Sequence, residues 1–477
     1  MYSKQKLNQR QLLPTSMKMA GFGSDAIDTT IMVVSAALVI LAAFSGKRGS
    51  GGPVPVMEAP SRGPVTGRPI TLALPQGTIE AIKEAMMGKG RNMPTVYLSS
   101  GSGVRNTSDR ETEPARKKNV FVDFHDDTAL RIVNGDGDFS VGSAKMQVDL
   151  PKIMASGKLG TLFFSIWSDP VFRGQEGFTN TLDIARTLKE TLARHEGQLQ
   201  VSTTRSDIEG AIGGGKVAVV LAVEGGHSIN NSLDNLEALY REGIRLLTLT
   251  HWNATEWAGS AHESRERGLS GIGTDVIATM NRLGMIIDVA HVSEPTIFDV
   301  ARVSKQPFVC SHGSSKSIYD KDRALSDDAI RAIAKSGGVI GITFFPEQLT
   351  SNPFIEKDAM TKMLGKLAEI EGNENLLPAE KARLSHRVLY NDYKVPSFVP
   401  GLDAVFKHID HITRLVGDKH VAIGSDFDGV PYFCKGLEDV SKLDNLAELL
   451  ATRGYSNASV GNIMGGNILR VIDNVMK

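Results

Sequence analysis

Cysteine and an excess of charge of either sign are what this sequence lacks most clearly. Only two of the 477 residues are cysteines, Cys310 and Cys434, so a disulfide framework is excluded in any compartment. The 53 Lys and Arg residues are balanced by 54 Asp and Glu residues, for a formal charge of −1. Proteins that bind nucleic acid need a basic surface, so we expect no nucleic-acid partner. Hydrophobic residues make up 41% of the chain, which excludes wholesale disorder.

Long hydrophobic runs are also scarce, with one exception near the N-terminus. Residues 29–46 form an uncharged stretch of 18 residues, at the short end of what spans a bilayer. Two interpretations remain open: a cleaved export signal or an uncleaved transmembrane anchor. We favour an anchor with an exported body, because basic residues dominate the tail at 1–28. The sequence therefore predicts a membrane-anchored or exported protein that contacts the membrane through this segment.

The rest of the chain divides into a linker and one large domain. Residues 47–118 begin with a Gly/Pro-rich stretch without apolar periodicity, typical of a linker or extension. The domain at 119–477 contains eight apolar runs, each followed by a helix-like stretch. These runs are 119–124, 160–167, 216–223, 244–250, 284–290, 307–311, 337–345 and 420–426.

The eight runs predict a (β/α)8 TIM-like barrel of the α/β class. They show no polar alternation, as expected for strands that are covered on both faces. Repeated strand–helix units indicate a parallel sheet, and eight of them indicate a barrel. The competing doubly wound sheet usually has a Gly-rich phosphate loop after its first strand, and this sequence has none there. Residues 346–399 interrupt the last two runs, and a lid and a surface excursion remain equal alternatives for them.

Polar residues follow the apolar runs, and they are the most informative feature of the sequence. Five of the 11 histidines stand at these positions. In a parallel barrel the carboxyl ends of all strands lie on one rim, so these side chains should converge. Imidazole and carboxylate together suit a cation such as Zn²⁺. The candidates are His125, Asp127, Glu224, His227, His251, Asp288, His291, His312, Asp426 and Asp428.

The spacing of these candidates predicts a site for two metal ions. His125 and Asp127 leave an extended backbone on the same side, so both can bind one ion. Glu224 can bridge two ions through its two oxygens, and His291 with His312 can hold the second. Two such ions would polarise a carbonyl and activate water for hydrolysis near neutral pH.

Seven motifs occur in a characteristic order from about Val120 to the C-terminus: VDFHDDTALRI, LAVEGGHSI, LLTLTHWNATEWA, NRLGMIIDVAHVS, CSHGSSKSI, DRALSDDAIRAI and AIGSDFDGVPYFCKGLEDVSKL. In these motifs the chain resembles the membrane (renal-type) dipeptidase family of zinc metallopeptidases. The resemblance implies a (β/α)8 barrel with two zinc ions per chain that hydrolyses dipeptides. The chain ends RVIDNVMK without a hydrophobic tail, so we expect a bacterial-type member rather than one with the lipid anchor of the animal members.

The resemblance also implies a role for each site residue. His125 and Asp127 bind one zinc ion, His291 and His312 bind the other, and Glu224 bridges both and takes part in catalysis. His251 binds the substrate and steadies the tetrahedral oxyanion. Arg323 pairs with the substrate carboxylate, which suits a guanidinium. Asp426 carries the proton to the leaving amine. Family members are often dimers, so a homodimer is a further expectation.

The sequence departs from the family pattern near the first histidine. Phe124 and Asp126 stand where the family more often has Gly and Asn, which affects only the surroundings of the ligands. Two alternative functions would require other residues at the rim. Another binuclear amidohydrolase-like hydrolase would typically bridge its metals with a carboxylated lysine, and Glu224 stands at the third strand end instead. A non-catalytic, membrane-tethered binding barrel would have lost ligands, and all five are present.

Several remaining polar and aromatic residues have plainer interpretations. We expect His227 to hold its turn, Asp288 to support His291 or the barrel interior, and Asp428 to orient a loop or ligand. His408 and His411 fit a solvated helix better than a metal site. Cys310 resembles a small buried hydrophobe. Core packing is the simpler expectation for the three tryptophans, Trp167, Trp252 and Trp257.

Overall fold

The computed structural model describes residues 120–351, 357–391 and 398–476. Within these ranges a parallel sheet runs through the order β1-β2-β4-β5-β6-β7-β8-β9. Its strands are β1 (Phe121–Asp126), β2 (Leu159–Trp167), β4 (Val217–Glu224), β5 (Ile244–Thr248), β6 (Ile286–Asp288), β7 (Phe308–Gly313), β8 (Ile340–Ile342) and β9 (Val421–Ile423). Each of the eight predicted apolar runs contains one of these strands or overlaps with it.

The first and last strands of this order approach each other and nearly close the sheet. A parallel bridge joins Asp126, at the end of β1, to Phe427, which follows β9. The Asp127 N–H donates to the Phe427 carbonyl at 2.8 Å. The fold is therefore an eight-stranded parallel barrel, and the predicted α/β barrel class is confirmed. A ninth strand, β3 (Leu199–Val201), pairs outside this order with β4 and was not predicted.

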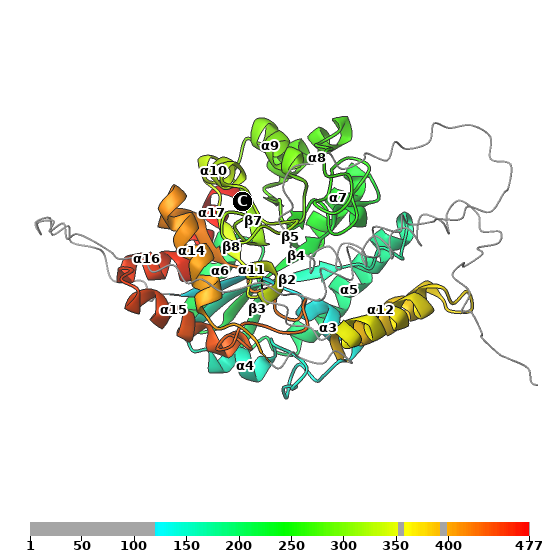
Figure 1. Ribbon diagram of the computed structural model, residues 1–477, viewed down its shortest axis with the longest axis horizontal. Helices are drawn as coiled ribbons and strands as arrows, with labels where there is room; N and C mark the ends of the chain where they lie inside the picture. The colour runs from blue at the N-terminus through cyan, green and yellow to red at the C-terminus, as the bar shows by residue number, and fades with distance from the viewer. Residues whose placement is uncertain (1–119, 352–356, 392–397, 477) are drawn as a thin grey trace, which may run out of the picture. The chain divides into compact units, whose positions relative to one another are not determined.

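Helices occupy the connections between the strands. Figure 1 shows α7, α8, α9 and α10 following one another around β4, β5 and β7. Serine or threonine side chains accept a backbone N–H at the start of five of the connecting helices, which satisfies donors that lack a partner within the helix. The helices between the strands are α3 (Thr128–Asn134), α4 (Leu150–Ala155), α5 (Gln175–Ala193), α6 (Arg205–Gly213), α7 (Leu233–Arg241), α8 (Gly271–Leu283), α9 (Glu294–Val303), α10 (Asp327–Lys335) and α14 (Asp403–Val416).

Three further helices, α15 (Leu443–Thr452), α16 (Asn457–Gly461) and α17 (Asn467–Val475), follow β9. The predicted insertion, which lies between β8 and α14, contains α11 (Pro346–Leu349), α12 (Lys357–Glu371), α13 (Pro378–His386) and the short π-helix η2 (Arg387–Asn391). The predicted tail, membrane segment and linker at 1–28, 29–46 and 47–118 lie outside the described residues. Among the helices that the structure describes, none is both long enough and apolar enough to cross a membrane.

Alternate residues of the strands belong to two buried clusters. On β4, Val219 and Leu221 pack in one cluster with most of the surrounding helices, whereas Val220 and Ala222 pack in a second cluster with side chains from the other strands and from α6 and α17. The strand side chains of this second cluster line the interior of the barrel. Glu224 continues the alternation of Val220 and Ala222, because side chains along a strand have period two. Its carboxylate is therefore directed to the inner side of the rim.

Candidate metal centre

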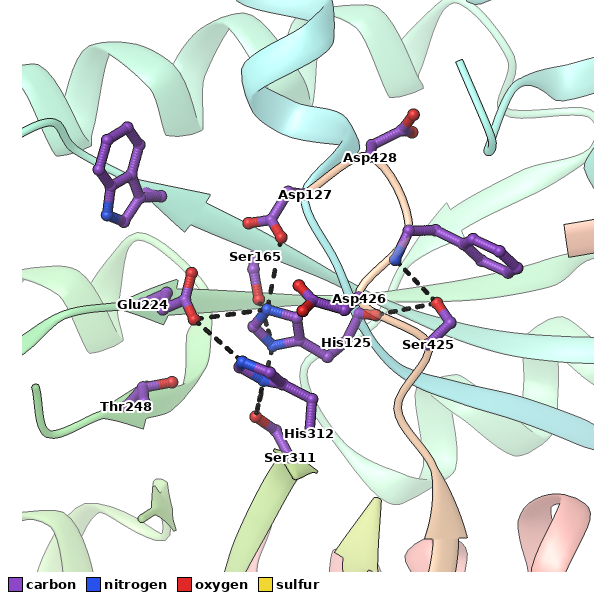
Figure 2. A network of polar contacts seen from close by, with 12 residues as sticks. His125, Asp127, Ser165, Glu224, Thr248, Ser311, His312, Ser425, Asp426 and Asp428 are labelled. Atoms are coloured by element: carbon purple, nitrogen blue, oxygen red, sulfur yellow. Dashed lines mark hydrogen bonds and ion pairs between the residues drawn. The ribbon is translucent and has the colours of Figure 1, made fainter. Parts of the chain in front are cut away.

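The carboxyl ends of the strands bring the predicted ligands together. Figure 2 shows the polar network at this rim, in which His125 on β1, Glu224 at the end of β4 and His312 on β7 lie side by side. Six of the candidate residues are almost completely buried, each no more than 6% exposed: His125, Asp127, Glu224, His291, His312 and Asp426. His251, which follows β5, is 12% exposed in its side chain.

Glu224 stands at the centre of this network. Its Oε1 atom lies 3.1 Å from Nε2 of His291, 3.5 Å from Nε2 of His312 and 3.6 Å from Nε2 of His125. Its Oε2 atom lies 4.0 Å from Nε2 of His251. A single carboxylate thus faces imidazoles from both predicted metal positions, as a bridging ligand must.

His125 is held so that one ring nitrogen faces the carboxylates. Its Nδ1 lies 3.1 Å from the Ser165 hydroxyl, and its Nε2 lies 3.5 Å from Oδ2 of Asp127. Burial lowers the pKa of His125, but Glu224 and Asp127 outweigh it and raise that pKa to about 10. The surroundings of this nitrogen therefore favour a positive charge.

The donor set fits metal ions. Three overlapping groups have ligand atoms within 4.8 Å of one another: His125, Glu224 and His312; Glu224, His251 and His291; and His125, Asp127 and Asp426. Within the described part of the chain, Nε2 of His125 is buried without a hydrogen-bond partner, and the carboxylates that face it favour a positive charge there, which a metal ion would supply. Imidazoles with carboxylates are the ligands that zinc prefers among oxygen and nitrogen donors.

Asp288 fixes the orientation of His312 through a serine. The Ser311 hydroxyl donates to Oδ2 of Asp288 at 2.6 Å, so its oxygen is left to accept the Nδ1 proton of His312 at 2.9 Å. The lone pair of His312 then lies on Nε2, which faces Glu224. Asp288 also accepts from the Thr248 hydroxyl at 2.6 Å. It thus acts as the predicted supporting residue, but its partner among the ligands is His312 rather than His291.

Two of the site residues adopt a left-handed backbone conformation. The φ angle is 65° at His291 and 68° at Asp426. This region is unfavourable for residues with a β-carbon, and such conformations gather at functional sites. The turn at Asp426 is stabilised by its N–H, which donates to the His125 carbonyl at 3.1 Å.

Arg323 lies in the loop between β7 and α10 and was predicted to pair with the substrate carboxylate. Its guanidinium instead contacts the predicted metal ligands. Its Nη1 lies 2.5 Å from Nε2 of His291 and 2.9 Å from Nε2 of His312. Its Nη2 lies 3.8 Å from Oδ2 of Asp426. The guanidinium therefore contacts the ring nitrogens through which both predicted ligands would bind a metal ion.

His251 receives a hydrogen bond that the sequence did not indicate. The indole N–H of Trp167 donates to its Nδ1 at 3.0 Å. Burial lowers the pKa of His251 well below its ordinary value, and the positive charges of His227 and Arg323 lower it further. His251 is therefore a neutral imidazole beside the carboxylate of Glu224.

The two aspartates of the last motif have different surroundings. Asp426 faces His125 and Asp127, and burial raises its pKa above the ordinary value. Asp428 instead accepts the backbone N–H groups of Gln147 and Val148 at 2.7 and 3.2 Å. Asp428 thus orients a loop, which is one of the two roles predicted for it, and Asp426 is the carboxyl group that borders the predicted ligands.

The insertion contributes residues that sequence reasoning missed. The ring of Tyr390, on η2, lies under the guanidinium of Arg131 at 4.5 Å. Its pKa is raised by burial and then by the negative charges of Asp127 and Asp426, so its phenol lies near the predicted ligands. His386 pairs with Asp136 at 2.5 Å. The end of the insertion therefore docks beside the loop that carries Asp127.

Several plainer expectations have mixed outcomes. His227 bonds the Ser168 carbonyl at 2.8 Å, as expected of a structural residue. The solvated-helix interpretation is wrong for His408, which is fully buried and bonds the N–H of Ser315 and the Leu349 carbonyl. The Ser315 N–H and the Leu349 carbonyl need partners where α14 covers them.

The expectations of burial for Cys310 and the three tryptophans are met only in part. Cys310 is buried as expected. Core packing is correct for Trp257, which is fully buried, but Trp252 is 41% exposed and stacks on His262 at 3.9 Å between ring centroids. Core packing is also wrong for Trp167, which serves as a hydrogen-bond donor at the rim.

A parallel barrel with carboxylate and imidazole ligands on its rim is the architecture of a metal-dependent hydrolase. Comparison with known proteins identifies a family within this class of hydrolases. The family described as membrane dipeptidase (peptidase family M19) matches residues 110–477. The chain belongs to this family, and the family resemblance seen in the sequence is confirmed.

Two relatives and one solved structure illustrate this membership. Dipeptidase verJ of Clonostachys rogersoniana is 33% identical over 62% of this chain, and the match spans 64% of that protein. The uncharacterized dipeptidase C965.12 of Schizosaccharomyces pombe is 30% identical over 68% of this chain and 71% of its own length. A crystal structure of dipeptidase AC, a metallopeptidase of family M19, has the same fold with a TM-score of 0.62. It is 23% identical, covering 76% of this chain and 99% of its own.

Proposed function

We propose that the protein hydrolyses the peptide bond of dipeptides at this rim with two zinc ions per chain. The observation that carries the proposal is the position of Glu224, one oxygen of which faces three imidazoles at 3.1–3.6 Å. His125 and Asp127 with Glu224 would hold one ion, and His291 and His312 with Glu224 would hold the other. The ions supply Lewis acidity and a nucleophilic water at neutral pH.

The residues around the proposed ligands suit the remaining tasks of peptide hydrolysis. His251 is neutral and borders Glu224, so it can donate a hydrogen bond to the carbonyl oxygen that gains negative charge. Asp426 has a raised pKa, which suits a group that holds a proton and delivers it to the leaving amine. Arg323 is a permanent cation at the site, and once turned away from His291 it can pair with a substrate carboxylate. A clamp on that carboxylate would hold the C-terminal residue of the substrate at the site.

The test is a panel of dipeptides, tripeptides and N-acetylated dipeptides offered to the full chain, stripped of metal and then supplied with Zn²⁺. We expect zinc-dependent cleavage of the dipeptides alone, abolished in Glu224→Gln. Glu237→Gln is the matched control, because Glu237 pairs with Arg241 and Arg282 on the outside of the barrel. Cleavage that persists without metal, or that prefers tripeptides, would overturn the proposal.

The location and assembly of the protein are separate proposals. The uncharged run at 29–46 supports an anchored or exported protein. Cell fractionation with N-terminal sequencing distinguishes an anchor from a cleaved signal, and recovery of the uncleaved protein away from the membrane would contradict both. Family resemblance supports a homodimer, which sedimentation of the purified protein tests.

A further inference from the structure

Trp167 and Glu224 end two neighbouring strands at the same level of the barrel. They are direct register partners in the parallel pair of β2 and β4. Side chains of register partners project on the same side of a sheet. The indole of Trp167 therefore shares the rim with the central carboxylate, from which it reaches the imidazole of His251.

The hydrogen bond between Trp167 and His251 can have only one direction. An indole nitrogen carries a hydrogen and has no acceptor capacity, so Nε1 of Trp167 must donate across the 3.0 Å to Nδ1 of His251. Nδ1 then carries the lone pair. In a neutral imidazole the single proton must consequently lie on Nε2.

The proton on Nε2 lies on the side of His251 that faces the site. Nε2 is 4.0 Å from Oε2 of Glu224, and the ring centroid is 4.5 Å from that of His291. The backbone of His251 is also tied down, because the Ser260 hydroxyl bonds its carbonyl at 2.9 Å. With the ring held and its tautomer set, His251 presents an N–H donor to the space beside the proposed ligands.

We propose that Trp167 is a positioning residue that fixes His251 in the tautomer with its proton on Nε2, ready to donate to the developing oxyanion. Only the donation to the oxyanion rests on the proposed function. The tautomer itself follows from the hydrogen bond. Trp252 provides a natural comparison, because its ring also packs against His251, at 5.8 Å between centroids.

The decisive measurement is nitrogen NMR of the full chain labelled with [15N]histidine, with the His251 signals assigned from their loss in His251→Gln. We expect Nδ1 to resonate as a lone-pair nitrogen and Nε2 to carry the proton. Trp167→Phe keeps an aromatic ring and removes the donor, so it should mix the two tautomers. Trp252→Phe should leave the wild-type signals unchanged.

Steady-state kinetics on the same proteins test the consequence of the tautomer. Because an oxyanion donor acts in the transition state, Trp167→Phe should lower kcat roughly tenfold or more with little change in KM or zinc content. A proton on Nδ1 in the wild type, or unchanged signals and kcat in Trp167→Phe, would overturn the inference. If the wild type cleaves no dipeptide, the proposed function fails, while the NMR result still decides the tautomer.

Discussion

Nη1 of Arg323 lies 2.5 Å from Nε2 of His291, closer than any other side-chain contact recorded for that imidazole. An imidazole nitrogen has one lone pair, so it can accept this hydrogen bond or bind a metal ion, but not both. The guanidinium and a cation therefore compete for the same nitrogen.

Because of this competition, Arg323→Gln should affect zinc binding and substrate binding in opposite ways. Removal of the cation should leave zinc affinity equal to that of the wild type or tighter, as measured with a competing chelator. It should also raise KM for dipeptides about 10–100-fold, because a charge-assisted hydrogen bond contributes about 1.5–3 kcal/mol. Arg265→Gln, which removes another rim arginine that pairs with Asp322, is the control. Weaker zinc binding together with an unchanged KM would contradict this role.

The two aspartates of the last motif should differ in what their loss affects. Asp428→Asn leaves one acceptor oxygen for the three donors that Asp428 now serves: the N–H groups of Gln147 and Val148 and the Thr128 hydroxyl. We expect its free energy of unfolding to fall by about 1–3 kcal/mol. Urea unfolding monitored by circular dichroism measures this change.

Asp426→Asn should give the complementary result. Loss of a proton-transfer group lowers kcat about 10²–10⁴-fold, and the free energy of unfolding should change by less than about 1 kcal/mol. The pair of variants thus separates a proton carrier from a loop anchor. A large kcat loss in Asp428→Asn with none in Asp426→Asn would reverse the assignment.

Asp169, just after β2, predicts a pH dependence of stability. Burial raises its pKa to about 6 from an ordinary value of 3.8, with a smaller contribution from Glu371 of α12. The folded chain therefore binds more protons than the unfolded chain between these values. The stabilisation from this proton is complete below pH 3.8 and is lost as the pH rises to about 6.

Asp169→Asn tests this pH dependence, because the amide oxygen can still accept the Val171 N–H at 2.9 Å. The free energy of unfolding of the variant, relative to the wild type, should rise by about 1–3 kcal/mol between about pH 4 and pH 7. Asp183→Asn, an exposed change on α5, should show no such trend. Parallel curves for Asp169→Asn and the wild type would mean that the pKa of Asp169 is not raised in the folded chain.

The sequence predicted the barrel because both faces of each strand are covered, which produces continuous apolar runs. It missed β3 because Gln200 divides its two apolar residues and polar residues flank the strand, so no continuous apolar run marks it. The convergence of His125, Glu224 and His312 was predictable, since parallel strands in a barrel share one rim.

Contacts between distant segments could not be predicted in the same way. Trp167 and His251 are 84 residues apart, and nothing in either segment indicates that one donates to the other. The partners of the buried His408 are Ser315 and Leu349, which lie 93 and 59 residues away in a loop and at the end of α11. A helical pattern indicates which residues share a face, but not what covers it.

The most direct test of the central claim is a zinc titration of the metal-stripped full chain, with bound metal and dipeptide hydrolysis followed together. If Glu224 bridges two ions, activity should reach its maximum at two zinc ions per chain, and Glu224→Gln should bind less zinc and remain inactive at saturation. Full activity at zero zinc, or Glu224→Gln that binds and hydrolyses like the wild type, would contradict the bridged two-metal site.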